Sequence, residues 1–204
     1  MKKILFLFIG PALFAATPQY QSPDITVPAA SADEAVLKQF SLAKADDYLE
    51  KGALAWTRKR GCVTCHTTGT YMQIRPELTS VLGEPTEEVR DLLTSELAEL
   101  QKMKHADLLK KTKPAEIIYT AAGLAQWDRH VTSKLSAETQ AALELMFRTQ
   151  EKSGTWHSVV LWPPLESSAF QEATVAVMAV ASAPQWRGNL KDEKLKAGVG
   201  LLQK

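Results

Sequence analysis

The segment Arg60–Thr67 (RGCVTCHT) constrains this 204-residue chain most strongly, because it contains both cysteines of the sequence. Cys62 and Cys65 are spaced Cys-x-x-Cys, and His66 follows at once. This is the pattern by which haem is attached covalently as haem c, with two thioether bonds to the porphyrin. The adjacent imidazole then binds the iron as its fifth ligand. The motif therefore predicts haem c held by Cys62, Cys65 and His66 in a haem-binding loop.

Other interpretations of the same motif have to be weighed. A structural zinc site requires about four thiolate or imidazole ligands, and the sequence has no second cysteine pair and no paired-histidine motif. A thioredoxin-like redox pair requires a βαβ context, which the flanking sequence does not show. An exported protein without haem can also carry a simple disulfide between these cysteines. A disulfide or redox pair thus stays as the alternative to haem.

The first 16 residues predict export. A positive start, Met1–Lys3, is followed by an apolar run from Ile4 to Phe14 and by the small residues Ala15 and Ala16. This is the pattern of a secretory signal peptide, and the apolar run is shorter than the roughly 20 residues of a membrane span. We therefore predict a signal peptide over residues 1–16 and a periplasmic or otherwise exported protein. The alternative is an uncleaved segment that anchors the chain to the membrane.

The rest of the chain is predicted to be a flexible linker over residues 17–30 and one domain over residues 31–204. Prolines among small and polar residues favour the linker, and 45% hydrophobic with 23% charged residues is typical of a globular domain. The chain has 24 basic and 23 acidic residues, and loss of Lys2 and Lys3 with the signal peptide leaves 22 against 23, a net charge of −1. This balance offers no electrostatic basis for nucleic-acid binding.

Apolar residues recur at helical intervals and no segment shows strand alternation, so the sequence predicts an all-α fold. A capping box at Ser31–Glu34 is expected to start the first helix, which continues to Gly61 with or without a break near Ser41. On this helix, Leu49, Ala53 and Trp56 are expected to face the core. Further helices are predicted over Tyr71–Arg75, Thr86–Leu100, Pro114–Trp127, Ser136–Phe147, Ser168–Ala181 and Lys191–Gln203.

One predicted helix differs from the others. The segment after Ser168 has apolar residues on nearly every side, including Phe170, Val177 and Met178. A helix without a polar face is buried between other helices, so we expect this helix to be buried. The Lys-rich segment 102–113 is expected to be irregular and exposed, and residues 153–166 to form a proline-stiffened loop.

Three pieces of sequence resemble a single repeat family. The motif Gln150-x-x-x-Gly154-x-Trp156 is similar to the Gln-x-x-x-Gly-x-Trp repeat motif of squalene–hopene cyclases. The segment Trp162–Ser167 (WPPLES) and an alanine- and threonine-rich helix follow it. The segment Gly52–Trp56, leading into the cysteine motif, resembles the opening repeat of haem-bearing members. The chain therefore resembles the α/α-toroid family of squalene cyclases and prenyltransferases.

The resemblance implies a fold but not the activity of that family. Each repeat in the family is a helical hairpin and neighbouring repeats bury a shared core, which implies helical-hairpin repeats in a partial α/α toroid. The Asp-x-Asp-Asp motif of the cyclases is missing, with Asp46–Asp47 only a fragment of it. The zinc-binding Asp/Cys/His set of the prenyltransferases is missing too, because both cysteines belong to the haem motif. Cyclase activity is not supported.

The sixth iron ligand would decide the chemistry of a haem at this motif. A methionine ligand raises the reduction potential and favours electron transfer, whereas an open position favours small-molecule or peroxide chemistry. Spacing does not choose among the candidate ligands, which are Met72, Met103, His105, His130, Met146, His157 and Met178. Candidate contacts of the porphyrin are Trp156, Trp162, Phe170 and, for a propionate, Arg75. The alternative is that the three aromatic residues belong to the loop and core of the repeat and that Arg75 is an exposed surface residue.

Together these features predict an exported c-type haem protein that acts in single-electron transfer, without catalytic residues and with a redox partner that the sequence does not identify. One alternative is a haem peroxidase-like enzyme with an open distal site. The other is a haem-less helical repeat module that binds a partner or an apolar ligand and carries a Cys62–Cys65 disulfide.

Overall fold

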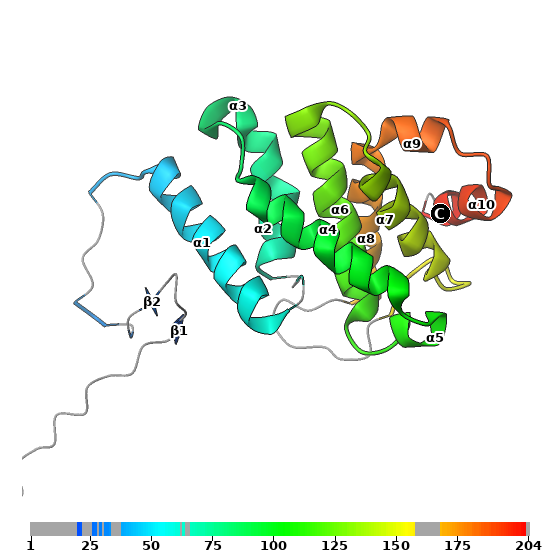
Figure 1. The fold of residues 1–204 in the computed structure, drawn as a ribbon, viewed down its shortest axis with the longest axis horizontal. Helices are drawn as coiled ribbons and strands as arrows, with labels where there is room; N and C mark the ends of the chain where they lie inside the picture. The colour runs from blue at the N-terminus through cyan, green and yellow to red at the C-terminus, as the bar shows by residue number, and fades with distance from the viewer. Residues whose placement is uncertain are drawn as a thin grey trace, which may run out of the picture. The chain divides into compact units, whose positions relative to one another are not determined.

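The computed structural model describes residues 20–21, 26–27, 29, 31–33, 38–61, 63, 66–157 and 168–202. The chain divides into two units, Met1–Gln39 and Phe40–Lys204. In the first unit, the two-residue strands β1 (Tyr20–Gln21) and β2 (Thr26–Val27) pair in antiparallel fashion. The second unit is built from helices (Figure 1), which confirms the all-α prediction. The predicted signal peptide lies outside the described residues.

The helices of the second unit follow the predicted order. In chain order they are α1 (Leu42–Arg60), α2 (Thr68–Ile74), the 3-10 helix η1 (Arg75–Leu78), α3 (Thr79–Leu82), α4 (Glu87–Lys102), α5 (His105–Leu108), α6 (Lys113–Trp127), the π-helical turn η2 (Asp128–Thr132), α7 (Ala137–Arg148), α8 (Ala169–Ser182), α9 (Pro184–Gly188) and α10 (Glu193–Leu201). The hydroxyls of Ser136 and Ser168 accept hydrogen bonds from backbone N–H groups three residues later, which confirms both predicted N-caps.

The first helix begins later than its capping box predicts. Ser31 to Asp33 form a turn in which the Ser31 hydroxyl accepts a hydrogen bond from the Asp33 N–H (3.2 Å), and residues 34–37 lie outside the described part. The helix begins after Ser41 instead. The prediction that Leu49 faces the core is wrong, since Leu49 is 56% exposed. The buried residues of α1 lie in its C-terminal half, from Ala53 onward, so the half that contains Leu49 stays outside the core.

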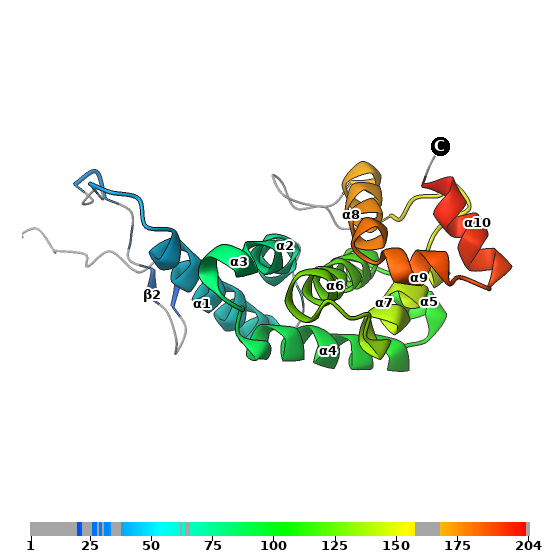
Figure 2. The same ribbon diagram turned by 90° about the horizontal axis from the view of Figure 1, so that it is seen from above.

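The central helix of the second unit is α6. Its residues from Pro114 to Trp127 are all buried, because α2, α4, α7 and α8 pack around it (Figure 2). Gly123 permits the closest of these approaches. A Cβ atom there would lie 2.6 Å from Leu93 Cδ2 of α4 and 2.9 Å from Met72 Cβ of α2. Both helices therefore reach the backbone of α6 at the same point.

Helix α8 is not buried on all sides, contrary to the prediction. Val175, Ala176 and Ala179 face the core, whereas Phe170 is 81% and Val177 44% exposed. The apolar composition of a helix does not fix how many neighbours cover it, and α8 packs mainly against α6, with smaller contacts to α7 and α9. The helix that is buried all round is α6.

Helices α2, α6 and α8 run in the same direction. The Gln171 side chain at the start of α8 donates to the Tyr119 hydroxyl of α6 (3.3 Å), and Arg129, just after α6, donates to the Ala181 carbonyl near the end of α8 (2.9 Å). Helix α2 approaches Gly123 in the middle of α6, and the continuations η1 and η2 of these two helices also touch. The N-terminal ends of all three helices therefore point to one end of the second unit.

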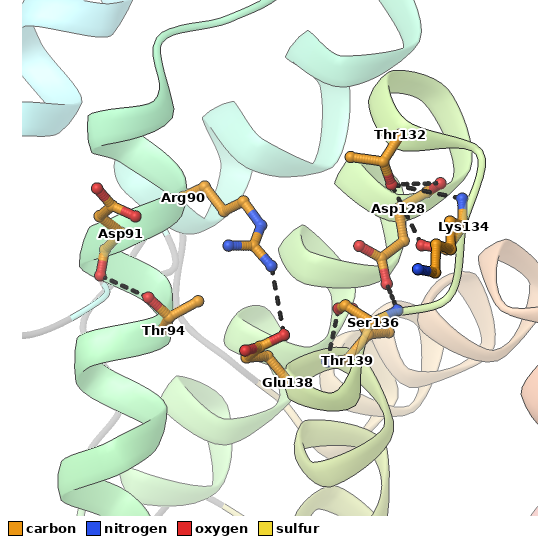
Figure 3. Close-up of polar contacts among 9 residues, drawn as sticks. All are labelled: Arg90, Asp91, Thr94, Asp128, Thr132, Lys134, Ser136, Glu138 and Thr139. Atoms are coloured by element: carbon orange, nitrogen blue, oxygen red, sulfur yellow. Dashed lines mark hydrogen bonds and ion pairs between the residues drawn. The ribbon is translucent and has the colours of Figure 1, made fainter.

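The turn between α6 and α7 reverses the chain through side-chain contacts (Figure 3). A carboxylate oxygen of Asp128 accepts a hydrogen bond from the Ser136 N–H (2.5 Å), just before α7 begins. Arg90 of α4 donates to Glu138 in the first turn of α7 (3.4 Å). Helix α7 then packs back along α6. Its last turn thus returns toward the end of the unit where α2 and α8 begin.

The Gln150–Trp156 motif forms a joint between α7 and α10. The Gln150 amide donates to the Gly154 carbonyl (2.9 Å) within the motif and to the Gly198 carbonyl of α10 (3.2 Å). The Trp156 side chain is fully buried and its indole N–H donates to the Met146 carbonyl of α7 (2.8 Å). Trp156 is therefore a core residue, not an available porphyrin contact.

A mostly buried pair of carboxylates, Glu96 and Glu116, connects α4 to α6. Lys113 Nζ lies 3.8 Å from Glu96 Oε1 and also pairs with Glu116. Glu116 accepts a further hydrogen bond from the Thr112 hydroxyl (3.0 Å). Burial raises the pKa of Glu96 to about 7; the charge of Lys113 opposes this shift and the nearby Glu116 adds to it. Glu96 therefore changes its charge near neutral pH.

We expect the free energy of unfolding to fall as the pH rises from about 5 to 8. The ordinary pKa of Glu96 is 4.5 and the folded-state pKa about 7, so the folded state binds more protons between these values. Stabilisation that is complete below pH 4.5 is thus lost as the pH passes through 7. The loss should be about 1–2 kcal/mol, because solvent screening and the coupled Glu116 reduce the full linkage effect. Urea denaturation at pH 5 and pH 8 measures it.

Two variants test the origin of this pH dependence. Glu96→Gln keeps the shape of the protonated acid and should flatten the dependence. Glu99→Gln alters a neighbouring side chain that is 68% exposed and contributes least to the raised pKa of Glu96, so it should reduce the dependence only slightly. A Glu96→Gln protein that keeps the full pH dependence would contradict the assignment to this pair.

Candidate functional site

The cysteine-containing loop joins the end of α1 to the start of α2. Gly61 ends α1 in the left-handed conformation (φ 66°), and its N–H donates to the Thr57 carbonyl (2.7 Å), as the sequence predicts for a helix-terminating glycine. Cys62 and Cys65 lie outside the described residues. Between them, Val63 is fully buried.

Two threonines hold α1 and α2 together beside the loop. Thr68, the first residue of α2, donates its hydroxyl to the Ala53 carbonyl of α1 (3.0 Å) and is hydrogen-bonded to the Thr57 hydroxyl. Both threonines are buried. The positions at which the loop leaves α1 and enters α2 are therefore fixed, with Val63 anchored in the core between them.

A second set of contacts links the two helices further along. Arg75 Nε donates to Asp46 Oδ1 (2.7 Å) and Arg75 Nη1 donates to the Gly83 carbonyl (3.0 Å). The Tyr71 hydroxyl donates to Glu50 Oε2 (2.9 Å) and also contacts Asp46 Oδ1 (3.3 Å). Burial and the hydrogen bond to Glu50 raise the pKa of Tyr71 above its ordinary value, so the phenol stays neutral.

These contacts correct one prediction. Arg75 is buried and its guanidinium is occupied by Asp46 and the Gly83 carbonyl. It therefore does not serve as a ligand for a haem propionate. Asp46, part of the fragment compared with the cyclase motif, has a structural role in holding α1 against α2.

His66 is exposed in the turn before α2. Its ring lies 5.3 Å from that of Trp56 in an edge-on arrangement, with an angle of 71° between the ring planes. The Arg60 guanidinium lies over the Trp56 ring, 4.9 Å from its centroid. An accessible imidazole with an apolar ring and a cation beside it suits haem c, whose macrocycle is apolar and whose propionates are anionic.

Sequence reasoning did not connect Trp56 and Arg60 with His66. The two residues are four apart on α1, a spacing that places side chains on the same helix face. The i, i+4 spacing of Trp56 and Arg60 was therefore a sequence signal for an aromatic ring and a cation placed together at the end of α1. The position of His66 beside it depends on the path of the loop, which spacing does not reveal.

Two candidate sixth ligands lie far from the motif. A side chain that shared one iron with His66 would have to lie within a few ångströms of it, because a metal–nitrogen bond is only about 2 Å long. Helix α4 begins beside the end of α1, where Arg58 Nε donates to Glu88 Oε1 (3.1 Å). Met103 and His105 follow the other end of α4, about 20 Å from that contact at a rise of 1.5 Å per residue. Neither one reaches an iron held by His66.

Four of the five remaining candidates are also excluded as a sixth iron ligand. His130 lies in η2, beyond the far end of α6, and Met178 lies two turns along α8 from Gln171, about 10 Å further from the motif. Met72 and Met146 are fully buried in the core. His157 is exposed after α7, at the end of the unit where α2 begins. It is the remaining candidate from the sequence.

The three aromatic residues considered as porphyrin contacts lie in different surroundings. Trp156 is buried between α7 and α10, Phe170 is largely exposed at the start of α8, and Trp162 lies outside the described residues.

Among the residues with described positions, no three His, Cys, Asp or Glu side chains are grouped to hold a metal ion. No helix in this part of the chain has the length and apolar character to cross a membrane.

Comparison of the chain with protein-family models, with curated proteins and with solved structures found no match. The resemblance to squalene cyclases and prenyltransferases therefore stays a prediction that rests on the motifs quoted above. The candidate site has to be judged on its own residues.

Proposed function

We propose that this chain is an exported c-type haem protein that transfers single electrons, with haem attached through Cys62 and Cys65 and its iron bound by His66. The observation that carries the proposal is the setting of His66. It is exposed next to Trp56, in a loop whose two ends are fixed by packed helices. Loop ends that are held by packed helices give a covalent cofactor a supported place of attachment.

The residues of the loop would have separate roles. When bound, haem c supplies an iron that takes up and releases one electron. A ring nitrogen of His66 would bind the iron, while the Trp56 ring shields one edge of this imidazole from water. The positive charge of Arg60 would offset a propionate. The buried Thr57–Thr68 contact keeps the loop ends together.

The proposal includes the export and repeat predictions. The signal-like residues 1–16 support export, and the joint at Gln150–Trp156 supports a helical-hairpin repeat built from α6 and α7. In this form the fold would be a partial α/α toroid whose first repeat carries the haem loop.

A haem peroxidase-like activity is the second candidate, favoured by the positions of the sixth-ligand candidates. Six of the seven side chains are buried in the core or lie away from His66. A haem without a sixth protein ligand is open to peroxide or other small molecules. A low-spin six-coordinate spectrum supports electron transfer, and a high-spin five-coordinate spectrum supports this second function.

Attachment of haem can be tested directly. Protein exported from a host that matures c-type cytochromes should show a haem-sized increase in intact mass and a pyridine haemochrome spectrum. Cys62→Ala/Cys65→Ala should lose both signals, whereas Thr64→Ala, in the same loop, should keep them. A wild-type mass two hydrogens below that of the reduced chain indicates a disulfide. That result would replace electron transfer with the haem-less binding module.

A further inference from the structure

The exposed face of α8 carries no charged side chain and is mostly apolar. Phe170, Val177, Met178 and Ala181 lie on it, and Phe170 is 81% exposed. The other two exposed residues of α8 are Gln171 and Thr174, which are polar but uncharged. Phenylalanine at such exposure loses contact with water when an apolar group covers it, which favours binding of such a group.

Phe170 lies level with His66 along the three parallel helices. The bond from Gln171 to Tyr119 sets α8 against α6, and the approach of α2 at Gly123 sets α2 against α6. All three helices rise by 1.5 Å per residue. Thr68, the first residue of α2, is four residues before Met72, so it lies at the height of Tyr119, four residues before Gly123. Phe170 lies at nearly the same height, because its neighbour Gln171 contacts Tyr119. Helices α2 and α8 also lie on the same side of α6, away from α4 (Figure 2).

Other large exposed apolar side chains lie elsewhere in the second unit. Tyr48 and Leu49 are about three turns before the end of α1, and Ile74 is two turns along α2 from His66. Phe40 precedes the start of α1, and Val81 lies in α3, beyond the far end of α2. Leu109 follows α5, beyond the far end of α4. Among these described side chains, Phe170 is the one that lies level with His66 on this side of α6.

We propose that Phe170 is a haem-contacting residue, whose ring covers part of the porphyrin held by Cys62, Cys65 and His66. This inference rests on the proposed function. It explains why an apolar ring stands exposed at the height of the cysteine loop, on a helix turn anchored to α6 by Gln171. It also separates Phe170 from Val177, which lies two turns further from the loop on the same face.

The inference predicts an effect that depends on haem. Phe170→Ala should lower the Tm of the haem-loaded protein by about 3–8 °C, through loss of the ring–porphyrin contact. In the Cys62→Ala/Cys65→Ala chain the same change should leave the Tm unchanged, because the ring is exposed there. The Soret circular dichroism of the loaded protein should also change with Phe170→Ala, and this second readout does not require the unloaded chain.

Val177→Ala is the matched control and should alter neither the loaded Tm nor the Soret signal. Equal effects of Phe170→Ala with and without haem, or an unchanged Soret signal, would overturn the assignment while haem attachment stands. A wild-type chain without haem overturns both proposals, and the intact mass distinguishes this outcome from a failure at Phe170 alone.

Discussion

Replacing Trp156 with alanine should lower the free energy of unfolding by about 3–5 kcal/mol, the usual range for a buried Trp or Phe. The Trp156 ring is fully buried and packs edge-on against Phe147 at a centroid distance of 5.9 Å. Phe147 in turn stacks on Trp186 at 5.7 Å. Alanine leaves a cavity beside this stack and removes the hydrogen bond to the Met146 carbonyl. Guanidinium denaturation followed by circular dichroism measures the change.

Trp156→Phe separates packing from hydrogen bonding. Phenylalanine fills most of the ring volume but has no N–H donor, so the Met146 carbonyl loses its partner and the cost should be about 1–2 kcal/mol. If the phenylalanine variant is as unstable as the alanine variant, the hydrogen bond dominates and the packing argument fails. A cost below about 1 kcal/mol for Trp156→Ala would contradict the buried joint altogether.

Helix ends were the most predictable part of this fold. Ser136, Ser168 and Gly61 act within one turn of their own position, through an N-cap hydrogen bond or a left-handed backbone. Such signals depend on few neighbouring residues. The capping box at Ser31 shows the limit, since a Ser-x-x-Glu pattern also occurs where the chain forms a turn.

Burial around a helix was less predictable, because it depends on neighbours far away in the sequence. Helix α6 contains Glu116, Thr120 and Gln126, which resemble surface residues in the sequence but are buried under four helices. Helix α8 has the more apolar sequence, yet Phe170 and Val177 are exposed. Composition describes a helix, whereas burial is a property of the helices packed against it.

The candidate site was predictable only where its residues adjoin in sequence. The Cys-x-x-Cys-His pattern and the glycine before it are read from six consecutive residues, Gly61 to His66. The contact of Arg75 with Asp46 joins positions 29 residues apart and has no local signal. For that reason the sequence presents Arg75 only as a propionate candidate or a surface residue, although it connects the two helices that flank the loop.

Arg75→Ala should lower the free energy of unfolding by about 3 kcal/mol, because it leaves the Asp46 carboxylate without its cation in a mostly buried position. The Arg75 and Asp46 side chains are 5% and 18% exposed. The Gly83 carbonyl loses its donor as well. Arg90→Ala is the matched control, since its ion pair with Glu138 is more exposed and should contribute less than about 1 kcal/mol. Urea denaturation of both variants at pH 7 gives the comparison.

The double variant Asp46→Asn/Arg75→Met shows whether the loss arises from an unpaired charge. With both charges removed, no buried ion is left, and the double variant should be more stable than Arg75→Ala. If it is as unstable as Arg75→Ala, the loss comes from packing between α1 and α2 rather than from the carboxylate. The same variants test whether the contact between α1 and α2 matters for haem attachment. If it does, Arg75→Ala should reduce the fraction of protein that carries haem, and the double variant should restore that fraction.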